Sequence, residues 1–468
     1  MYRYERVPHG APSGELAQLV QRVEAGMDRG LLPVEVFCDP TVFRAEMERI
    51  FGSTWVFVAH DSEIPKTGDY VLRKIGIDTV IVARDEQGQV NVMLNHCRHR
   101  GSEVCHEDRG NTKHFKCPYH GWTYNIKGEF AGAPHFGEAY GQPLDRKAWG
   151  LRRAPQVDSI HGFIFACLDP LTPPLREALG DAVKVLDAIF GLHPKGMRAI
   201  APPERFTVKA DWKSGAENFC GDAYHVSTAH VSAGLSEFIP DVRQVSAIAR
   251  GLDLGNANSF IAHELTQWGP MFEYWAYPRE VVEQFDFSSL DPALREMIRT
   301  SPPTIGTIFP NFSYLRFPQP AVAGGRPYPF TSIRMWQPVS PGVMELWNWQ
   351  FEYACVDEAT TKESYLAGVY GFGSGGIFEQ DDTAVWEGIA KAASSPWNRR
   401  DGVMLHYQQK RVEPSGEWKG PGRFYDNIYG ERLQEGFWRR WVKEMKGGAA
   451  RPICIHEEKA QGACGGDK

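Results

Sequence analysis

The N-terminal part of the chain carries apolar side chains at helical spacing. They recur three or four positions apart and stop before Gly30, at Leu16, Leu19, Val20, Val23 and Met27. Such a period marks one face of an α-helix, and glycine is common just beyond a helix end. The pattern predicts a short amphipathic helix, and we expect residues 1–49 to form a helical segment that packs on the domain at the C-terminal side of the chain.

From about Trp55 the period changes from that of a helix to that of a β-strand. Short runs rich in β-branched and aromatic residues are joined by turn signals at residues 86–88 and 126–128. The runs are TWVFVAH (54–60), DYVLRKIG (69–76), DTVIVARDEQGQVNVML (78–94), WTYNIKGEF (122–130) and GFIFACLDP (162–170). This spacing and composition predict a small all-β domain, which we place at residues 50–172.

The remainder of the chain mixes the two periods. Helical patterns alternate with strand-like runs such as FTSIRMWQPV (330–339) and VMELWNWQFEYA (343–354). We therefore expect a larger α+β domain at residues 173–447, with helices on an antiparallel sheet. Residues 448–468 are small and polar and are expected to form a C-terminal tail. The stretch FPQPAVAGGRPYPF (317–330) is longer than a usual turn, and we expect it to help shape a pocket.

Composition and charge exclude several classes of partner. The 468 residues are 42% hydrophobic and 23% charged, which is typical of a globular protein with a sizeable core. The net charge of −7 without a basic run argues against nucleic acid and anionic membrane as partners. No apolar run is long enough to span a bilayer and the N-terminus does not resemble a signal peptide, so we expect a cytoplasmic protein. Nine cysteines, an odd number, fit reduced thiols and metal ligands better than disulfides.

Two short segments of the predicted β domain carry a metal-ligand pattern. Cys97-x-His99 is followed, after 17 residues, by Cys117-x2-His120, so each segment supplies one thiolate and one imidazole. A structural zinc ion is the simple alternative for this ligand set. Zinc fingers, however, usually pair Cys with Cys and His with His. The mixed pairing favours a two-iron cluster in which one iron takes both cysteines and the other both histidines.

With Arg100-Gly101 after the first pair and Gly121-Trp122 after the second, the pattern resembles the Rieske [2Fe–2S] motif of ring-hydroxylating oxygenases. The resemblance implies one Rieske cluster, whose imidazole ligands give it a higher reduction potential than an all-cysteine cluster has. Respiratory Rieske proteins have an extra cysteine before the second histidine, where this chain has Tyr119. The disulfide that joins the two loops in those proteins is therefore not expected here.

A second candidate site lies in the segment ADWKSGAENFCGDAYHVSTAH of the larger domain. If this segment is helical, Asn218, Asp222 and His225 fall on one stripe at i, i+4 and i+7. His230 would lie about 140° around the helix from His225, so both imidazoles reach one metal only if the helix bends or ends between them. We expect that break at Ser227-Thr228. A plain polar helix face is the alternative interpretation.

A carboxylate further along the chain completes a metal-ligand set. In YGFGSGGIFEQDDTAVWEGI, Asp382 lies on an apolar helical stripe, whereas Asp381 lies on a weaker face. The stripe consists of Phe378, Asp382, Val385 and Ile389. An acid among apolar residues is costly unless it is paired or metal-bound. Two imidazoles and one carboxylate form the facial triad of mononuclear iron(II), with open positions for dioxygen and substrate. A competing assignment makes Asp222 the third ligand and leaves Asp382 structural.

The resemblance extends to this part of the chain. ENFxGDAYHVxxxH and GxFEQDD look like the catalytic domain of the large (alpha) subunit of Rieske oxygenases, which has a helix-grip, TBP-like fold. The mononuclear iron ligands that it implies are His225, His230 and Asp382. It further implies that Asn218 hydrogen-bonds near the iron. Asp222 would link His225 to a cluster histidine, here His120, across the interface with a neighbouring subunit.

The resemblance also implies a substrate class, a reaction and partners. Phe219, Phe372 and Phe378 would line an apolar substrate pocket, with core packing as the alternative. The implied reaction adds O2 to an aromatic ring to give a cis-dihydrodiol. The electrons would come from NADH through a separate reductase, with or without a ferredoxin, because the chain has no dinucleotide fingerprint. An α3 or α3β3 oligomer, the latter with a small beta subunit, is implied. The alternatives are a Rieske monooxygenase or demethylase and a non-catalytic electron carrier.

Overall fold

The computed structural model describes residues 3–8, 12, 14–140, 144–235, 249–263, 269–407, 412–447 and 450–455. Its α-helices are α1 (Gly14–Met27), α2 (Pro40–Glu46), α3 (Phe136–Ala139), α4 (Leu175–Leu179), α5 (Ala182–Phe190), α6 (Trp212–Gly221), α7 (Val226–Ala229), α8 (Val231–Leu235), α10 (Arg279–Val282), α11 (Pro292–Thr300), α12 (Glu358–Phe372), α13 (Ile377–Ser394), α14 (Pro396–Asp401) and α15 (Arg432–Met445). Among the described residues, none of the helices is both long and apolar enough to cross a bilayer.

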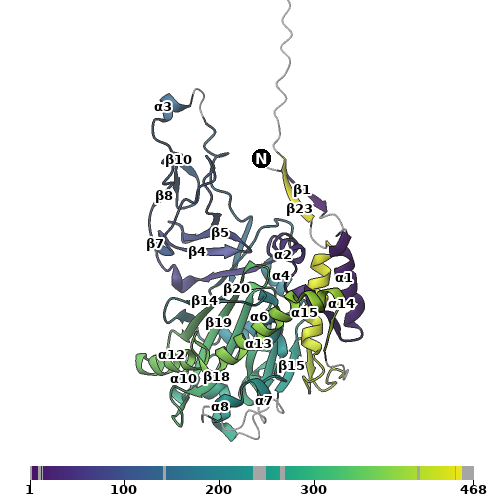
Figure 1. Cartoon of the computed structure of the whole chain (residues 1–468). Coiled ribbons are helices and arrows are strands. Elements are labelled where there is room, and N and C mark those ends of the chain that lie inside the picture. Colours follow the sequence, from purple (N-terminus) through teal and green to yellow (C-terminus); the bar gives the residue numbers. More distant parts are fainter. Residues whose placement is uncertain are drawn as a thin grey trace, which may run out of the picture.

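A small lobe of antiparallel strands stands at the top of Figure 1. One of its sheets has the order β6-β5-β4-β7 and the other β10-β9-β8. The strands are β4 (Asp69–Ile75), β5 (Asp78–Arg84), β6 (Val90–Leu94), β7 (Arg109–Asn111), β8 (His114–Lys116), β9 (Thr123–Asn125) and β10 (Phe130–Gly132). A separate hydrophobic core lies inside this lobe and includes Tyr70, Phe115, Trp122 and Tyr124. The predicted all-β character of this part of the chain is confirmed.

A third sheet connects the small lobe to the large one. It has the order β11-β12-β3 and consists of β3 (Val56–His60), β11 (Gln156–Ile160) and β12 (Phe163–Cys167). Phe57 in β3 packs edge-on against Phe312 and Trp349, with ring centroids 5.1 and 5.6 Å apart. These three strands therefore share a core with the large lobe, although they were predicted as part of the 50–172 domain.

The large lobe is built on one nine-stranded antiparallel sheet. Its order is β13-β20-β19-β18-β17-β16-β15-β22, and β14 pairs with β20 off this path. The strands are β13 (Met197–Ala199), β14 (Glu204–Val208), β15 (Ala249–Asp253), β16 (Ser259–His263), β17 (Pro303–Ile308), β18 (Phe312–Pro320), β19 (Pro327–Ser340), β20 (Val343–Tyr353) and β22 (Arg423–Tyr425). Helices α6, α13 and α15 lie across one face of the sheet in Figure 1. The predicted α+β class is confirmed.

Both ends of the described chain pack on the large lobe or on each other. Helix α1 buries Leu19, Val20 and Val23 and contacts α15, and the chain turns at Gly30, whose φ is +64°. The remaining strands are β1 (Arg3–Pro8), β2 (Leu31–Pro33), β21 (Met404–His406) and β23 (Ala450–Ile455). β1 pairs with β23, and β2 pairs with β21. Residues 456–468 of the predicted tail lie outside the described part of the chain.

A fully buried charge cluster fixes the start of α6. Lys213 Nζ lies 2.7 Å from Glu46 Oε1 in α2 and 2.6 Å from Asp211 Oδ1. The indole N–H groups of Trp212 and Trp441 also donate to Glu46. Because buried charges must be paired and hydrogen-bonded, this cluster holds the N-terminal segment, α6 and α15 in one arrangement. The C-terminal end of α6 carries the candidate site.

Candidate metal centres and substrate pocket

The two predicted cluster-binding loops are closed in the same way. The N–H of Gly101 donates to the Cys97 carbonyl at 2.9 Å, and the N–H of Gly121 donates to the Cys117 carbonyl at 3.0 Å. Both glycines have positive φ, +79° and +73°, which residues with a Cβ rarely adopt. The glycine that follows each Cys/His pair in the sequence is therefore the residue that folds the loop back on itself.

The four predicted cluster ligands differ in exposure. The thiols of Cys97 and Cys117 are buried, whereas His99 and His120 are half-buried, with ring centroids 4.5 Å apart. His99 stacks on Trp122 at 5.2 Å, and its buried Nδ1 has no hydrogen-bond partner among the described residues. An orphaned buried ring nitrogen suits a metal ligand, since an unpaired buried polar atom is otherwise costly. Two buried thiols and two half-buried imidazoles fit the ligand set of a Rieske cluster.

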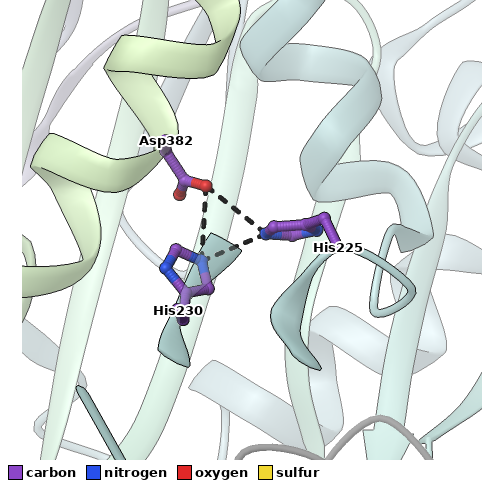
Figure 2. A group of neighbouring side chains, drawn as sticks. All are labelled: His225, His230 and Asp382. Atoms are coloured by element: carbon purple, nitrogen blue, oxygen red, sulfur yellow. Dashed lines mark hydrogen bonds and ion pairs between the residues drawn. The ribbon is translucent and has the colours of Figure 1, made fainter. Parts of the chain in front are cut away.

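His225, His230 and Asp382 converge in the large lobe, as Figure 2 shows. Asp382 Oδ1 lies 3.3 Å from the Nε2 atom of each histidine, and the two Nε2 atoms are 3.1 Å apart. These are the only three His, Cys, Asp or Glu side chains in the described part of the chain whose ligand atoms all lie within 4.8 Å of one another. Two nitrogens and one carboxylate oxygen aimed at one point fit a divalent metal ion that keeps open positions.

The far side of each imidazole faces another carboxylate. His225 Nδ1 lies 3.3 Å from Asp222 Oδ2, and His230 Nδ1 lies 3.5 Å from Asp381 Oδ2. Asp222 therefore lies behind the His225 ring, whereas Asp382 lies on the side where the ligand atoms converge. Carboxylates in this position orient metal-binding imidazoles.

Charge in the triad is reflected in the pKa values. Burial alone would lower the pKa of His225, but the carboxylates of Asp222 and Asp382 raise it well above its usual value. Burial would raise the pKa of Asp382, but hydrogen bonds from His225 and His230 lower it. The two imidazoles therefore hold the buried carboxylate of Asp382 in its ionised form.

The predicted helix break between the two histidines was placed wrongly. Ser227 and Thr228 lie inside the short helix α7, whereas α6 ends at Gly221 and Asp222 leaves helical geometry with φ −87° and ψ 80°. At this end of α6 the chain lies close against α15, since a Cβ at Gly221 would lie 2.4 Å from Leu433 Cδ1. His225 and His230 consequently flank α7, which lets both rings face one point.

The predicted buried face of α13 is confirmed at Phe378 and Asp382 and is wrong at Val385. Asp382 and Phe378 are buried, but Val385 is 48% exposed. Trp386 is buried instead and packs edge-on against Trp336 of β19 at 5.6 Å. The large indole, and not the smaller valine, fills the space between helix and sheet, which rotates the buried face by one position.

A cavity that is partly open to solvent adjoins the triad. It is lined by Asn218, Phe219, Ala223, His225, Val226, His230, His263, Ile305, Leu315, Phe317, Gln319, Phe372, Phe378 and Asp382. The predicted lining residues Phe219, Phe372 and Phe378 are all present, and the Phe372 and Phe378 rings stack at 4.8 Å. Arg334, paired with Glu379, lies over Phe219 and Phe372 at 5.0 and 5.3 Å and holds this wall in place.

Five lining residues from the sheet were not predicted: His263, Ile305, Leu315, Phe317 and Gln319. Leu315, Phe317 and Gln319 alternate along β18 and so point to the same face. The only sequence signal was the long stretch 317–330, which was expected to shape a pocket and contributes Phe317 and Gln319.

Comparison with known proteins gives matches along both lobes. The family model described as the Rieske [2Fe-2S] domain matches residues 54–147, and the model described as the ring hydroxylating alpha subunit (catalytic domain) matches residues 197–446. The chain is 52% identical over 450 residues to the N,N-dimethyl phenylurea N-demethylase subunit alpha of Sphingobium sp. (strain YBL2), covering 95% of this chain and 98% of the relative.

Dioxygenases are also among the relatives. The biphenyl dioxygenase subunit alpha of Paraburkholderia xenovorans (strain LB400) is 30% identical over 444 residues, covering 89% of this chain and 91% of the relative. The crystal structure of naphthalene 1,2-dioxygenase from Rhodococcus sp. bound to indole matches with a TM-score of 0.87 at 36% identity, covering 93% of this chain and 99% of that chain.

Proposed function

The chain belongs to the family of ring-hydroxylating oxygenase alpha subunits, and on that premise we propose that it removes an N-methyl group from a neutral N,N-dimethyl aryl urea. The predicted family, its oxidoreductase class and its two cofactors, one Rieske [2Fe–2S] cluster and one mononuclear iron, are confirmed by the domain matches and the structural likeness. The zinc-module and pure electron-carrier interpretations do not account for both domains.

We assign each cofactor to one group of side chains. The cluster ligands in this proposal are Cys97, His99, Cys117 and His120, and the mononuclear iron ligands are His225, His230 and Asp382. The orphaned Nδ1 of His99 and the convergence of two Nε2 atoms on Asp382 Oδ1 support this assignment. When bound, the cluster supplies single electrons and the mononuclear iron activates dioxygen.

The residues behind the triad hold protons and orient rings. Asp222 lies 3.3 Å from His225 Nδ1 and favours the tautomer with its proton on Nδ1, which leaves His225 Nε2 free to ligate, and Asp381 faces His230 Nδ1 at 3.5 Å. Asp381 also accepts a hydrogen bond from Ser232 at 2.7 Å, which fixes its carboxylate. In this proposal Asn218, which lines the cavity, hydrogen-bonds beside the reacting atoms.

The observation that carries the proposal is that the triad opens directly onto a largely apolar cavity. Phe372 and Phe378 form a stacked aromatic wall beside His230, whose ring lies 5.2 Å from that of Phe378. Such a wall excludes water and accepts a flat aromatic group. The 52% identity to an N-demethylase along nearly the whole chain supports the N-methyl group as the reacting part.

In the proposed reaction, one oxygen atom of O2 enters a C–H bond of the N-methyl group. The resulting N-hydroxymethyl compound releases formaldehyde and leaves an N–H. The other oxygen atom leaves as water after uptake of two electrons and two protons. The family consists of multicomponent oxygenases with electron-transfer partners and oligomeric assemblies. We propose an NADH-dependent reductase, with or without a ferredoxin, as the electron source.

The positions of the two centres in one chain support an oligomer. The cluster loops lie beside β8 at one end of the molecule and α7 lies at the other end (Figure 1). Asp222 keeps 26% of its side chain exposed beside His225, and His120 is half-buried at the tip. In the proposed α3 or α3β3 assembly, Asp222 of one subunit meets His120 of its neighbour and links the two centres.

Ring cis-dihydroxylation is the second candidate function, favoured by the TM-score of 0.87 to naphthalene 1,2-dioxygenase. That reaction adds both atoms of one O2 to adjacent ring carbons, again with two electrons and two protons. The two candidates share both metal centres. They differ only in whether an N-methyl group or a ring edge faces the triad.

A product assay under ¹⁸O2 separates the candidates. Purified holoenzyme with a surrogate reductase is given N,N-dimethyl-N′-phenylurea or naphthalene, and formaldehyde, the monomethyl urea and cis-diols are measured. We expect one formaldehyde per urea consumed and little diol from naphthalene. Doubly labelled cis-diol from naphthalene with no formaldehyde from the urea would establish the second candidate instead. The His225→Ala variant, which lacks an iron ligand, should form neither product.

A further inference from the structure

The wall that the sheet contributes to the cavity includes two polar residues that are not part of the metal-binding triad. His263, at the end of β16, and Gln319, in β18, both line the cavity and are 3% and 1% exposed. Phe317, which lies between Leu315 and Gln319 on the same face of β18, has its ring 6.2 Å from that of His263. His263 and Gln319 interrupt an otherwise apolar part of the wall.

The carboxamide of Gln319 is oriented by one of its own hydrogen bonds. Its Nε2 donates to the carbonyl oxygen of Ala367 in α12, so an exchange of Oε1 and Nε2 would set two acceptors against each other. Gly371 lets α12 come this close, because a Cβ there would lie 2.2 Å from Gln319 Nε2. Gln319 Oε1 is left buried without a hydrogen-bond partner among the described residues. A buried acceptor of this kind calls for a partner that binds later.

His263 presents a second acceptor. Its Nδ1 lies 2.8 Å from Thr304 Oγ1, and that hydroxyl donates to the Ile261 carbonyl at 3.3 Å. We assign the hydroxyl proton to the Ile261 carbonyl, so that Nδ1 carries the ring proton and donates to Thr304. His263 Nε2 then carries a lone pair. Burial, with the charge of Arg250, lowers the pKa of His263 to about 4, so the ring is neutral at pH 7.

We propose that Gln319 Oε1 is an acceptor that recognises the N–H group of a neutral aryl urea or anilide, with His263 as a second neutral polar group of the same cavity. Both groups are uncharged, so the complement is a neutral donor and not an ammonium group. An arene without a donor would leave Gln319 Oε1 buried and unpaired, and sites built to hydrogen-bond a donor discriminate strongly against analogues that lack it.

This inference rests on the proposed function and sharpens its substrate class. An N,N-dimethyl-N′-aryl urea has a single N–H, which lies between the aromatic ring and the carbonyl group. Holding that N–H at Gln319 determines which end of the molecule faces the triad. Gln319 and His263 are therefore positioning residues, and they select the N-methyl group over the ring edge for oxidation.

A pair of probes that differ in one group tests the acceptor site. N,N-dimethyl-N′-phenylurea has the N–H, and phenyl N,N-dimethylcarbamate has an oxygen atom in its place but the same dimethylamino end. Binding to anaerobic oxidised holoenzyme is measured by calorimetry, and kcat and KM are measured from formaldehyde release. We expect the wild-type protein to bind the urea at least about tenfold more tightly than the carbamate, mostly as a difference in KM.

The Gln319→Met variant keeps the length of the side chain and removes the acceptor. It should bring the urea-to-carbamate affinity ratio close to one, and His263→Leu should reduce it about threefold. Gln350→Met is the matched control. Gln350 is also buried and meets α12 at a glycine, Gly368, and its side chain likewise lacks hydrogen-bond partners, but it does not line the cavity. This control should keep the wild-type ratio.

The possible outcomes separate the inference from the proposed function. If the wild-type protein demethylates both compounds with equal affinity, or if Gln319→Met keeps the wild-type ratio, the acceptor site is wrong and the proposed function stands. If neither compound binds or releases formaldehyde, the proposed function fails and takes this inference with it. A ratio lost in Gln319→Met but kept in Gln350→Met establishes the site.

Discussion

At the tip of the molecule, Cys97 and Cys117 each begin a loop that a glycine closes four residues later, with N–H···O distances of 2.9 and 3.0 Å. The catalytic triad instead combines two histidines that flank α7 with Asp382 from α13, far along the chain. The cluster loops are thus shaped by local backbone hydrogen bonds. The triad exists only because the fold brings Asp382 of α13 within 3.3 Å of the two histidines.

The two centres also differ in exposure. His99 and His120 are half-buried at the tip, which suits the exchange of electrons with another protein. Asp382 and His230 are buried beside an apolar cavity, which suits chemistry that must exclude water. Exchanging an electron and oxidising a substrate need different surroundings, and the two lobes of this chain provide one each.

The largest effect is expected from Asp382→Ala. It removes one of three converging ligand atoms, so the mononuclear iron should be lost while the cluster remains, and formaldehyde release should fall at least about a thousandfold. Iron analysis and electron paramagnetic resonance of the reduced protein measure the two centres separately. Asp381→Asn, one residue away, should keep its iron. Full iron content in Asp382→Ala would disprove the proposed ligand set.

Asp222→Asn should have the next largest effect. The neutral amide cannot accept as strongly from His225 Nδ1, and the link to a neighbouring subunit is weakened, so turnover should fall by about 10- to 100-fold with both centres loaded. Stopped-flow reoxidation of the reduced cluster measures the step between them. Normal reoxidation in this variant would mean that electrons take another route.

At the tip, Tyr124→Phe should shift the potential of the cluster and change turnover only a few-fold. The Tyr124 hydroxyl lies 3.2 Å from Cys97 Sγ, and a hydrogen bond to a ligand sulfur stabilises the reduced cluster. The loss of about 1 kcal/mol should lower the reduction potential by a few tens of millivolts. Redox titration followed by circular dichroism checks this. The exposed Tyr119→Phe variant is the control and should keep the wild-type potential.

The smallest functional effect, together with a clear effect on stability, is expected at Glu217 in α6. Burial raises the pKa of this carboxyl to about 8 in the folded protein, although the Trp438 N–H donates to it at 3.0 Å. The folded state therefore keeps a proton that the unfolded state releases above about pH 4.5. This contribution to stability is present at low pH and is lost as pH rises towards 8, by up to about 1.4 kcal/mol per pH unit.

Glu217→Gln should remove that dependence. The thermal unfolding midpoint of the variant, relative to wild type, should rise between pH 6 and pH 8, and its activity at pH 7 should stay within about twofold. Glu435→Gln, which changes a carboxyl whose pKa is lowered and not raised, is the control. A parallel pH dependence in Glu217→Gln and wild type would show that Glu217 is ionised in the folded protein.

Much of the fold could be predicted from local patterns. The strands of the small lobe follow the alternation of β-branched and aromatic residues, and α1 follows its apolar spacing. The four cluster residues could be named because they lie on two short loops with fixed spacing. The pair of histidines and the buried Asp382 could also be named, since an acid on an apolar stripe stands out in any sequence.

Long-range contacts accounted for the errors. Gly221 at the end of α6 lies against Leu433 in α15, and Val385 is exposed where Trp386 meets Trp336. Neither contact leaves a signal in the local period. The helix break expected at Ser227-Thr228 and the buried face expected for α13 were therefore wrong in position, although both helices were expected.

The sequence by itself determined which residues can bind metal, because ligand chemistry and turn geometry are properties of a few neighbouring residues. Only the tertiary structure decided which of them meet and what the cavity offers a substrate. Gln319 becomes an unpaired acceptor on the cavity wall only when α12 packs against β18 at Gly371. Burial removes the water that would otherwise pair with it, and burial is a property of the whole fold.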